Sequence, residues 1–140
     1  MSTSGSKTEI ANIAKTYTFK LYCTGPGGVS PTVSASVIVS PPPVTIPAAP
    51  TGLTATAIST SQINLTWVDN ATNETAYQVE RSIDSITWTV LSSTLAVNSV
   101  SYSATGLTSA TRYYFRVKAI NSAGSSGYSN TASAITQSNI

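Results

Sequence analysis

The back part of the chain alternates strictly between apolar and polar positions. The alternation runs through residues 63–67, 77–80 and 113–119. Clusters of Asp, Asn, Ser and Gly, which favour turns, separate these segments. No window of helical length carries apolar residues at the spacing of a helix. Because short alternating strands between turns are typical of antiparallel sandwiches, the pattern predicts an all-β fold.

One face of these strands predicts a hydrophobic core. The predicted core residues are Leu53, Ala55, Ile63, Leu65, Trp67, Tyr77, Val79, Val90, Val100, Tyr102, Leu107, Tyr113, Phe115, Val117, Ala119 and Ile135. A large apolar side chain contributes about 1.5–3 kcal/mol when it is fully buried. A set of this size can therefore offset the ordering entropy of one small domain. We expect Trp67, the largest side chain on its strand, at the centre.

A proline-rich segment at residues 40–50 divides the chain. Five of its positions are proline, which fixes φ and removes the backbone donor, so neither a helix nor a central strand can continue through it. The sequence predicts an extended linker of roughly 30 Å, at ~3.1 Å per residue. The predicted organisation is a front segment at 1–39, this linker at 40–50, and a sandwich domain at 51–140.

The front segment carries two further alternating runs, joined by a glycine-rich turn at residues 24–28. They predict a β-hairpin, and a lone hairpin is marginal in water because one apolar face stays wet. Two interpretations follow. The hairpin is part of a longer multidomain chain, or it is a strand-exchange segment that completes a sheet in another molecule. Repeated head to tail, strand exchange would build a filament. The predicted strand-exchange residues are Tyr17, Phe19, Leu21, Cys23, Val33, Val37 and Val39.

The ordered series of short motifs in the back part resembles a fibronectin type III domain. The motifs lie at residues 50–53, 65–67, 77–82, 106–107, 113–117 and 119–121. Residues 67–74, followed by Tyr77 and Arg81, are similar to bacterial extracellular versions of this domain. Leu107 and Tyr113 have the spacing of a tyrosine corner, in which the phenol hydroxyl satisfies a backbone group. The resemblance covers residues 47–137 and implies a seven-stranded antiparallel sandwich. The front hairpin resembles the C-terminal hairpin of an immunoglobulin-like domain.

The resemblance implies a structural, spacing or binding role rather than catalysis. The expected partners are neighbouring protein domains or identical subunits, and a polysaccharide is the alternative partner. The corresponding location is extracellular or at the cell surface. One alternative function is the filament subunit above. Another is an accessory carbohydrate-binding module of a polysaccharide-degrading enzyme. The loop at residues 121–128 carries no Arg-Gly-Asp tripeptide, so nothing supports integrin recognition by that route.

Composition argues against several kinds of chemistry. Only 9% of the residues are charged and histidine is absent, which argues against Ser-His and Cys-His nucleophile pairs. A net charge of +2 without a basic tract argues against a nucleic-acid partner. No apolar run approaches the ~20 residues of a bilayer span, so we expect no membrane insertion. We therefore predict no enzyme activity, no cofactor and no metal site.

The single cysteine and the few carboxylates each allow two readings. Cys23 is either a small buried hydrophobe or, as the immunoglobulin-like resemblance implies, half of a pair whose partner lies elsewhere. Asp69 and Glu74 bracket a loop that superficially resembles a calcium site, but Asx-type turn capping explains it more simply. Glu80 and Asp84 lie along one strand and its turn on a flat sheet, which offers no cleft for a glycosidase.

The outward face of the central strands is the candidate interaction face. Its residues are Gln78, Glu80, Trp88, Tyr114, Arg116, Lys118 and Tyr128. Glu80 opposite Arg116 or Lys118 predicts a cross-strand ion pair, worth about 0.2–1 kcal/mol when exposed. The aromatic planes could stack on a sugar or on a protein. Alternatively, they are strand formers that shield backbone hydrogen bonds.

Overall fold

The computed structural model describes residues 13–139, and every regular element among them is a β-strand. The all-β prediction is confirmed. The chain divides into two compact units, Met1–Pro43 and Val44–Ile140. Residues 1–12 of the predicted front segment, including Glu9, lie outside the described residues.

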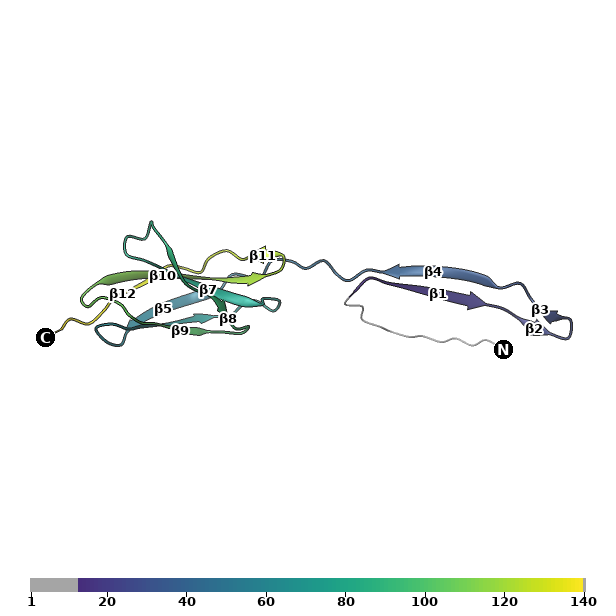
Figure 1. The fold of residues 1–140 in the computed structure, drawn as a ribbon, viewed down its shortest axis with the longest axis horizontal. Coiled ribbons are helices and arrows are strands. Elements are labelled where there is room, and N and C mark those ends of the chain that lie inside the picture. Colours follow the sequence, from purple (N-terminus) through teal and green to yellow (C-terminus); the bar gives the residue numbers. More distant parts are fainter. Residues whose placement is uncertain (1–12, 140) are drawn as a thin grey trace. The chain divides into compact units, whose positions relative to one another are not determined.

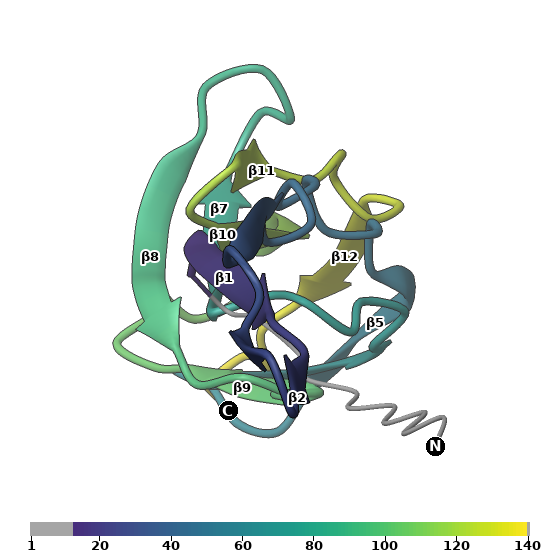
Figure 2. The same ribbon diagram turned by 90° about the vertical axis from the view of Figure 1, so that its right-hand side faces the viewer.

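The back unit is a sandwich of two antiparallel sheets (Figures 1 and 2). One sheet has the order β5-β6-β9, with β5 at Thr51–Ala57, β6 at Ile63–Val68 and β9 at Ser101–Ala104. The other has the order β11-β10-β7-β8, and β12 also pairs with β10. Its strands are β7 at Ala76–Ser82, β8 at Thr89–Leu95, β10 at Arg112–Asn121, β11 at Gly124–Ser125 and β12 at Ala132–Ile135. Apart from the two-residue β11, these are the seven strands that the sequence predicts.

The core lies between the two sheets, and most of its residues are the predicted ones. The buried residues are Leu53, Ile63, Leu65, Trp67, Tyr77, Val79, Ala104, Leu107, Tyr113, Phe115, Val117 and Ala119. The predicted Ala55 and Tyr102 are partly buried and pack against this cluster. The rings of Trp67 and Tyr77 lie 5.9 Å apart between centroids.

Three predicted core residues are exposed instead. Val90, Val100 and Ile135 each leave 49% of their surface in solvent. On β8 the register against β7 shifts twice, which turns Leu91 rather than Val90 toward the core. Val100 precedes β9, where its carbonyl accepts the N–H of Trp67 at 3.0 Å. On β12, Ala132 and Ala134 pack against the core. Because side chains alternate along a strand, the predicted Ile135 lies on the other face.

The tyrosine corner is present. The Tyr113 ring is buried, and its hydroxyl accepts the backbone N–H of Thr108 at 3.0 Å. Burial raises the pKa of Tyr113, but the hydrogen bonds with Thr108 and the charge of Arg81 together lower it by more, so the net pKa lies below the ordinary value. The bond ties the loop before β10 to the core, as this motif does in related sandwiches.

The second half of the predicted linker is held against the sandwich. Residues 44–50, which we call the pinned segment, contain no helix or strand, but Pro47 and Pro50 are buried. Three asparagine side chains bind its backbone carbonyls. The bonds run from Asn73 Nδ2 and Asn121 Nδ2 to Thr45 O (2.8 Å each) and from Asn70 Nδ2 to Ala49 O (2.9 Å). The compact unit therefore begins at Val44, inside the predicted linker.

The front unit contains the predicted hairpin. β1 (Lys15–Leu21) pairs with β4 (Val33–Val39) in an unbroken antiparallel register, from Lys15 opposite Val39 to Leu21 opposite Val33. Two short strands, β2 (Thr24–Gly25) and β3 (Gly28–Val29), form its tip. Gly28 has a φ of 110°, a value that L side chains rarely adopt, so glycine suits this turn.

Candidate functional site

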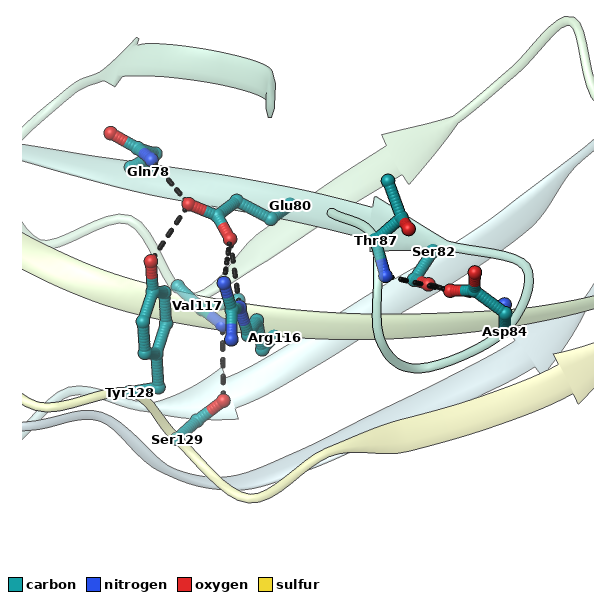
Figure 3. Close-up of polar contacts among 9 residues, drawn as sticks. All are labelled: Gln78, Glu80, Ser82, Asp84, Thr87, Arg116, Val117, Tyr128 and Ser129. Carbon is teal, nitrogen blue, oxygen red and sulfur yellow. Dashed lines mark hydrogen bonds and ion pairs between the residues drawn. The ribbon is translucent and has the colours of Figure 1, made fainter. Parts of the chain in front are cut away.

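The outward face of β7 and β10 carries the predicted interaction residues. Strand alternation places Gln78 and Glu80 on the side of β7 opposite the core, and it does the same for Arg116 and Lys118 on β10. The register sets Arg116 directly opposite Glu80, and Lys118 opposite Gln78. Figure 3 shows the side chains of Gln78, Arg116 and Tyr128 around the Glu80 carboxylate. The ion pair predicted for Glu80 therefore forms with Arg116, the residue opposite it.

Glu80 is the centre of this face and is only 5% exposed. Its Oε2 accepts Arg116 Nε at 2.7 Å and pairs with Arg116 Nη2 at 2.6 Å. Its Oε1 accepts the Tyr128 hydroxyl at 2.8 Å and Gln78 Nε2 at 2.6 Å. Burial raises the pKa of Glu80, but the bonds from Arg116, Tyr128 and Gln78 lower it by more, so the net pKa is below the usual value. The expected exposed ion pair is thus a largely buried one with several donors.

Two aromatic rings lie against the Arg116 guanidinium. Its Cζ is 4.1 Å from the centroid of Trp88 and 3.8 Å from that of Tyr128. Lys118 Nζ is 5.2 Å from the Tyr128 centroid. These are cation–π distances, and the planar guanidinium suits such stacking. We call Gln78, Glu80, Trp88, Arg116, Lys118 and Tyr128 the guanidinium cluster. Because its cations already lie over the rings, the ring faces toward them are not open to a sugar.

Tyr114 is the seventh predicted face residue and stands apart from the cluster. It lies on β10 opposite Ser82 and is half-buried. In the described part of the chain its side chain makes no hydrogen bond or ring contact. The structure therefore brings six of the seven predicted residues together.

The loop that carries Tyr128 is held in place by serines that sequence reasoning did not single out. The Ser126 hydroxyl accepts the N–H of Ala119 at 2.9 Å, and the Ser129 hydroxyl accepts the N–H of Val117 at 3.1 Å. The backbone N–H groups of both serines donate to carbonyls of β10 at 2.8 Å. Their three-residue spacing, on either side of Tyr128, was the only signal in the sequence.

The turn that leads to Trp88 is closed by Asp84. Its Oδ1 accepts the N–H of Thr87 (2.7 Å) and the hydroxyl of Ser82 (2.8 Å) (Figure 3). It also accepts the N–H of Ile86 (2.9 Å). The backbone bonds from Thr87 and Ile86 hold the pKa of Asp84 well below its usual range. Asp84 is thus a turn-forming residue, and Ser82 and Asp84, two residues apart, are the sequence signal for it.

The loop bracketed by Asp69 and Glu74 shows the predicted turn. Asp69 Oδ1 accepts the N–H of Ala71 at 2.9 Å, an Asx turn, and it also accepts the hydroxyl of Tyr77. Burial and this bond raise the pKa of Tyr77 well above its ordinary value. Glu74 is buried and accepts the N–H of Asn98 at 3.1 Å. Among residues 13–139, no group of three or more His, Cys, Asp or Glu residues could hold a metal ion.

The predicted strand-exchange residues lie on one hairpin, and all but one of them share a face. Strand alternation and the β1–β4 register place Tyr17, Phe19, Leu21, Val33, Val37 and Val39 on the same side. Cys23 lies beyond the end of β1, where its N–H donates to Ser30 Oγ at 3.0 Å. Its side chain is an exposed free thiol, so the interpretation as a small buried hydrophobe is wrong. No helix among the described residues is long and apolar enough to cross a bilayer.

Comparisons with known proteins cover both units. The family model of the fibronectin type III domain matches residues 48–135. Chitinase Chi52 of Paenibacillus xylanexedens is 34% identical over 117 residues, which are 82% of this chain and 19% of that protein. The chain thus spans about a fifth of the chitinase.

Solved structures resemble the sandwich. An Fn3-like protein from Clostridium thermocellum is 31% identical with a TM-score of 0.56, covering 69% of this chain and 98% of that one. Domains A168–A170 of titin are 26% identical with a TM-score of 0.60, covering 76% of this chain and 37% of that one.

Proposed function

Because the chain belongs to the fibronectin type III family, we propose that it is a non-catalytic spacer module in a secreted, multidomain protein that degrades polysaccharide. Its similarity to a chitinase of which it spans 19% supports this proposal. An enzyme that degrades an insoluble polymer meets its substrate outside the cell, which supports an extracellular location. The partners of the module are then the neighbouring domains of the same protein.

The chitinase similarity also bears on the front unit. It spans 82% of the chain, which is more residues than Val44–Ile140 contains. The two proteins therefore share part of the front segment as well as the sandwich. We propose that residues 1–39 are a partial immunoglobulin-like segment and that residues 40–43 are the freely extended part of the linker.

The pinned segment is the observation that carries the spacer proposal. A spacer transmits position only if the chain leaves the domain at a fixed point, and loose termini do not do this. Here two asparagines converge on the Thr45 carbonyl, and a third holds the Ala49 carbonyl. Asn121 also donates to the Asn73 carbonyl at 3.0 Å, which connects two of the three asparagines that hold the segment. The side-chain amides of these asparagines hold the backbone in place, which is a structural role rather than a chemical one.

The test is the order of the pinned segment in solution. We expect ¹⁵N order parameters of roughly 0.85 for Thr45, Ile46 and Ala49, the value of rigid backbone. Asn121→Ala removes one of the two amide bonds to the Thr45 carbonyl and also the bond from Asn121 to the Asn73 carbonyl. In this variant we expect these values to fall toward about 0.6, the flexible range.

Asn64→Ala is the matched control, since Asn64 lies on β6 and accepts a side-chain bond from Gln62. This variant should leave the pinned segment ordered. Low order parameters in the unmodified chain would refute the spacer proposal.

A second candidate function is that of an accessory carbohydrate-binding module. The chitinase similarity favours it, and so do the rings of Trp88 and Tyr114, which are both only half-buried. A chitin pull-down compares the unmodified chain with Trp88→Ala/Tyr114→Ala. If binding occurs and the double variant loses it, this function holds. If chitin retains the unmodified chain and the double variant equally, this function is excluded.

A further inference from the structure

The side chains of the pinned segment resemble those of a protease substrate. Val44 and Ile46 are 60% and 58% exposed, and Ala48 is exposed as well. Small apolar side chains such as valine and alanine suit the small S1 pocket of an elastase-type endoprotease. Exposed segments are also the sites at which proteases preferentially nick a chain. Judged by its side chains alone, the segment should be cut after Val44 and after Ala48.

The backbone of the same segment is not free to enter a protease. An extended peptide binds a protein through main-chain hydrogen bonds, which need free backbone groups. Here the side-chain amides of Asn73 and Asn121 occupy the Thr45 carbonyl, at 2.8 Å each. Asn70 Nδ2 occupies the Ala49 carbonyl at 2.9 Å. The carbonyls on either side of the susceptible bonds are therefore already bonded to the sandwich.

Packing adds to these hydrogen bonds. Pro47 and Pro50 are buried among the exposed residues of the segment. Ile46 lies close to the turn between β10 and β11, since a Cβ atom added at Gly124 would lie 3.4 Å from Ile46 Cγ2. A protease can therefore reach the segment only after it detaches locally from the sandwich, and such local opening costs less free energy than global unfolding.

We infer that residues 44–49 form a latent proteolytic site, which the three asparagines keep closed. The enzyme it would admit is an endoprotease that prefers small apolar residues. Such an enzyme hydrolyses the C–N bond after Val44 or Ala48, and water supplies the hydroxyl of the new carboxyl group and a proton of the new amine. The cut separates the front unit from the sandwich. The inference rests on the proposed spacer role for its biological use, because only an uncut spacer connects two units.

Limited proteolysis of the full chain with elastase tests the inference. The elastase concentration is kept where cutting is slow relative to reclosing, so that the rate reports the population of the detached segment. Mass spectrometry follows fragments that begin at Thr45 or Ala49. We expect slow cutting of the unmodified chain. Asn121→Ala loses its bonds to the Thr45 and Asn73 carbonyls and should be cut about 10- to 100-fold faster.

A second variant and a control separate this effect from a folding defect. Asn73 is exposed, and Asn73→Ala removes its bonds to the carbonyl and the hydroxyl of Thr45. This variant should be cut about 5- to 50-fold faster than the unmodified chain. Asn64→Ala, the matched control on β6, should be cut at the unmodified rate. In all four proteins the segment 51–139 should stay intact while the cuts at 44–49 accumulate.

Three outcomes overturn the inference. Fast cutting of the unmodified chain at 44–49 means that the site is open. Equal rates for the unmodified chain, Asn121→Ala and Asn73→Ala mean that the asparagines do not close it. Cuts mainly within 51–139 mean that the protease acts on the globally unfolded chain. The spacer proposal is judged separately by the order parameters, so an ordered segment with unchanged cutting rates ends this inference and leaves the spacer proposal standing.

Discussion

Two antiparallel strand pairs in this chain share one pattern of apolar and polar residues, but the apolar face is buried in only one of them. β7–β10 and β1–β4 both pair in register and alternate apolar with polar residues. On β7–β10, Val79 and Phe115 are 0% exposed, whereas on β1–β4 Phe19 is 60% exposed. The difference is the sheet β5-β6-β9, which faces the first pair and supplies residues such as Trp67. Alternation thus specifies a strand and its apolar face, but burial depends on a second layer encoded elsewhere.

The polar faces of the two pairs differ as well. On β1–β4 the cross-strand pair Thr18–Ser36 consists of two exposed hydroxyls. On β7–β10 the pair Glu80–Arg116 is covered by Trp88 and Tyr128, which come from outside both strands. Coverage by other segments turns a weak surface pair into one whose disruption is costly.

The largest expected effect comes from deleting matched aromatic rings on the two pairs. Phe115→Ala leaves a cavity in the core and should lower the free energy of unfolding of the sandwich by about 3–5 kcal/mol. Phe19→Ala should change it by less than about 0.5 kcal/mol. Urea unfolding followed by tryptophan fluorescence measures both, because both tryptophans lie in the back unit.

This pair of variants tests whether the front hairpin and the sandwich unfold independently of each other. If Phe19→Ala destabilised the sandwich by more than about 1 kcal/mol, well beyond the usual effect of a surface substitution, the two units would unfold as one. The hairpin face would then be part of the same cooperative structure rather than an open surface.

The second expected effect concerns the covered polar face. Arg116→Met leaves the buried Glu80 carboxylate without its cation and should cost about 2–4 kcal/mol, somewhat reduced by the partial exposure of Arg116. Lys118→Met, on the same strand, should cost less than about 1 kcal/mol. The same urea titrations measure both variants.

A double-mutant cycle with Glu80→Gln/Arg116→Met assigns the loss to the pair. The double variant should recover part of the stability that Arg116→Met loses, because no unpaired buried charge remains. Strictly additive losses would mean that the ion pair contributes no coupling and that the cluster is ordinary surface.

Much of the sandwich could be predicted because its signals are local. Alternation predicts β6, β7 and β10, and the spacing of Leu107 and Tyr113 predicts the tyrosine corner. The errors at Val90 and Ile135 arise where the phase of a strand depends on its neighbour. The double register shift between β7 and β8 is a property of the pairing, which no single-strand pattern contains.

The candidate site was harder to predict because its contacts are distant in sequence. Asn121 reaches the Thr45 carbonyl across 76 residues, and Tyr128 reaches Glu80 across 48. The sequence predicted which residues share the outward face, since that follows from alternation. It could not predict that Glu80 is buried, because Trp88 and Tyr128 approach from a turn and a loop.

The smallest expected effect is a dependence on pH that the strand pair β7–β10 should show and the strand pair β1–β4 should not. The folded-state pKa of Glu80 lies below its unfolded value of about 4.3, so its contribution is present above that pH and is lost as pH falls through the folded pKa. Glu80→Gln should therefore be less stable than the unmodified chain by about 1–2 kcal/mol at pH 7. This difference should shrink as the pH falls below about 4. Urea midpoints at several pH values measure it. The described part of the front unit contains no Asp or Glu. Glu9 lies outside it, so the amide chemical shifts of β1 and β4 are followed in a Glu9→Gln background, where they should stay constant over the same range. A hairpin that changed with Glu80 would show that the covered and the open strand pairs are energetically linked.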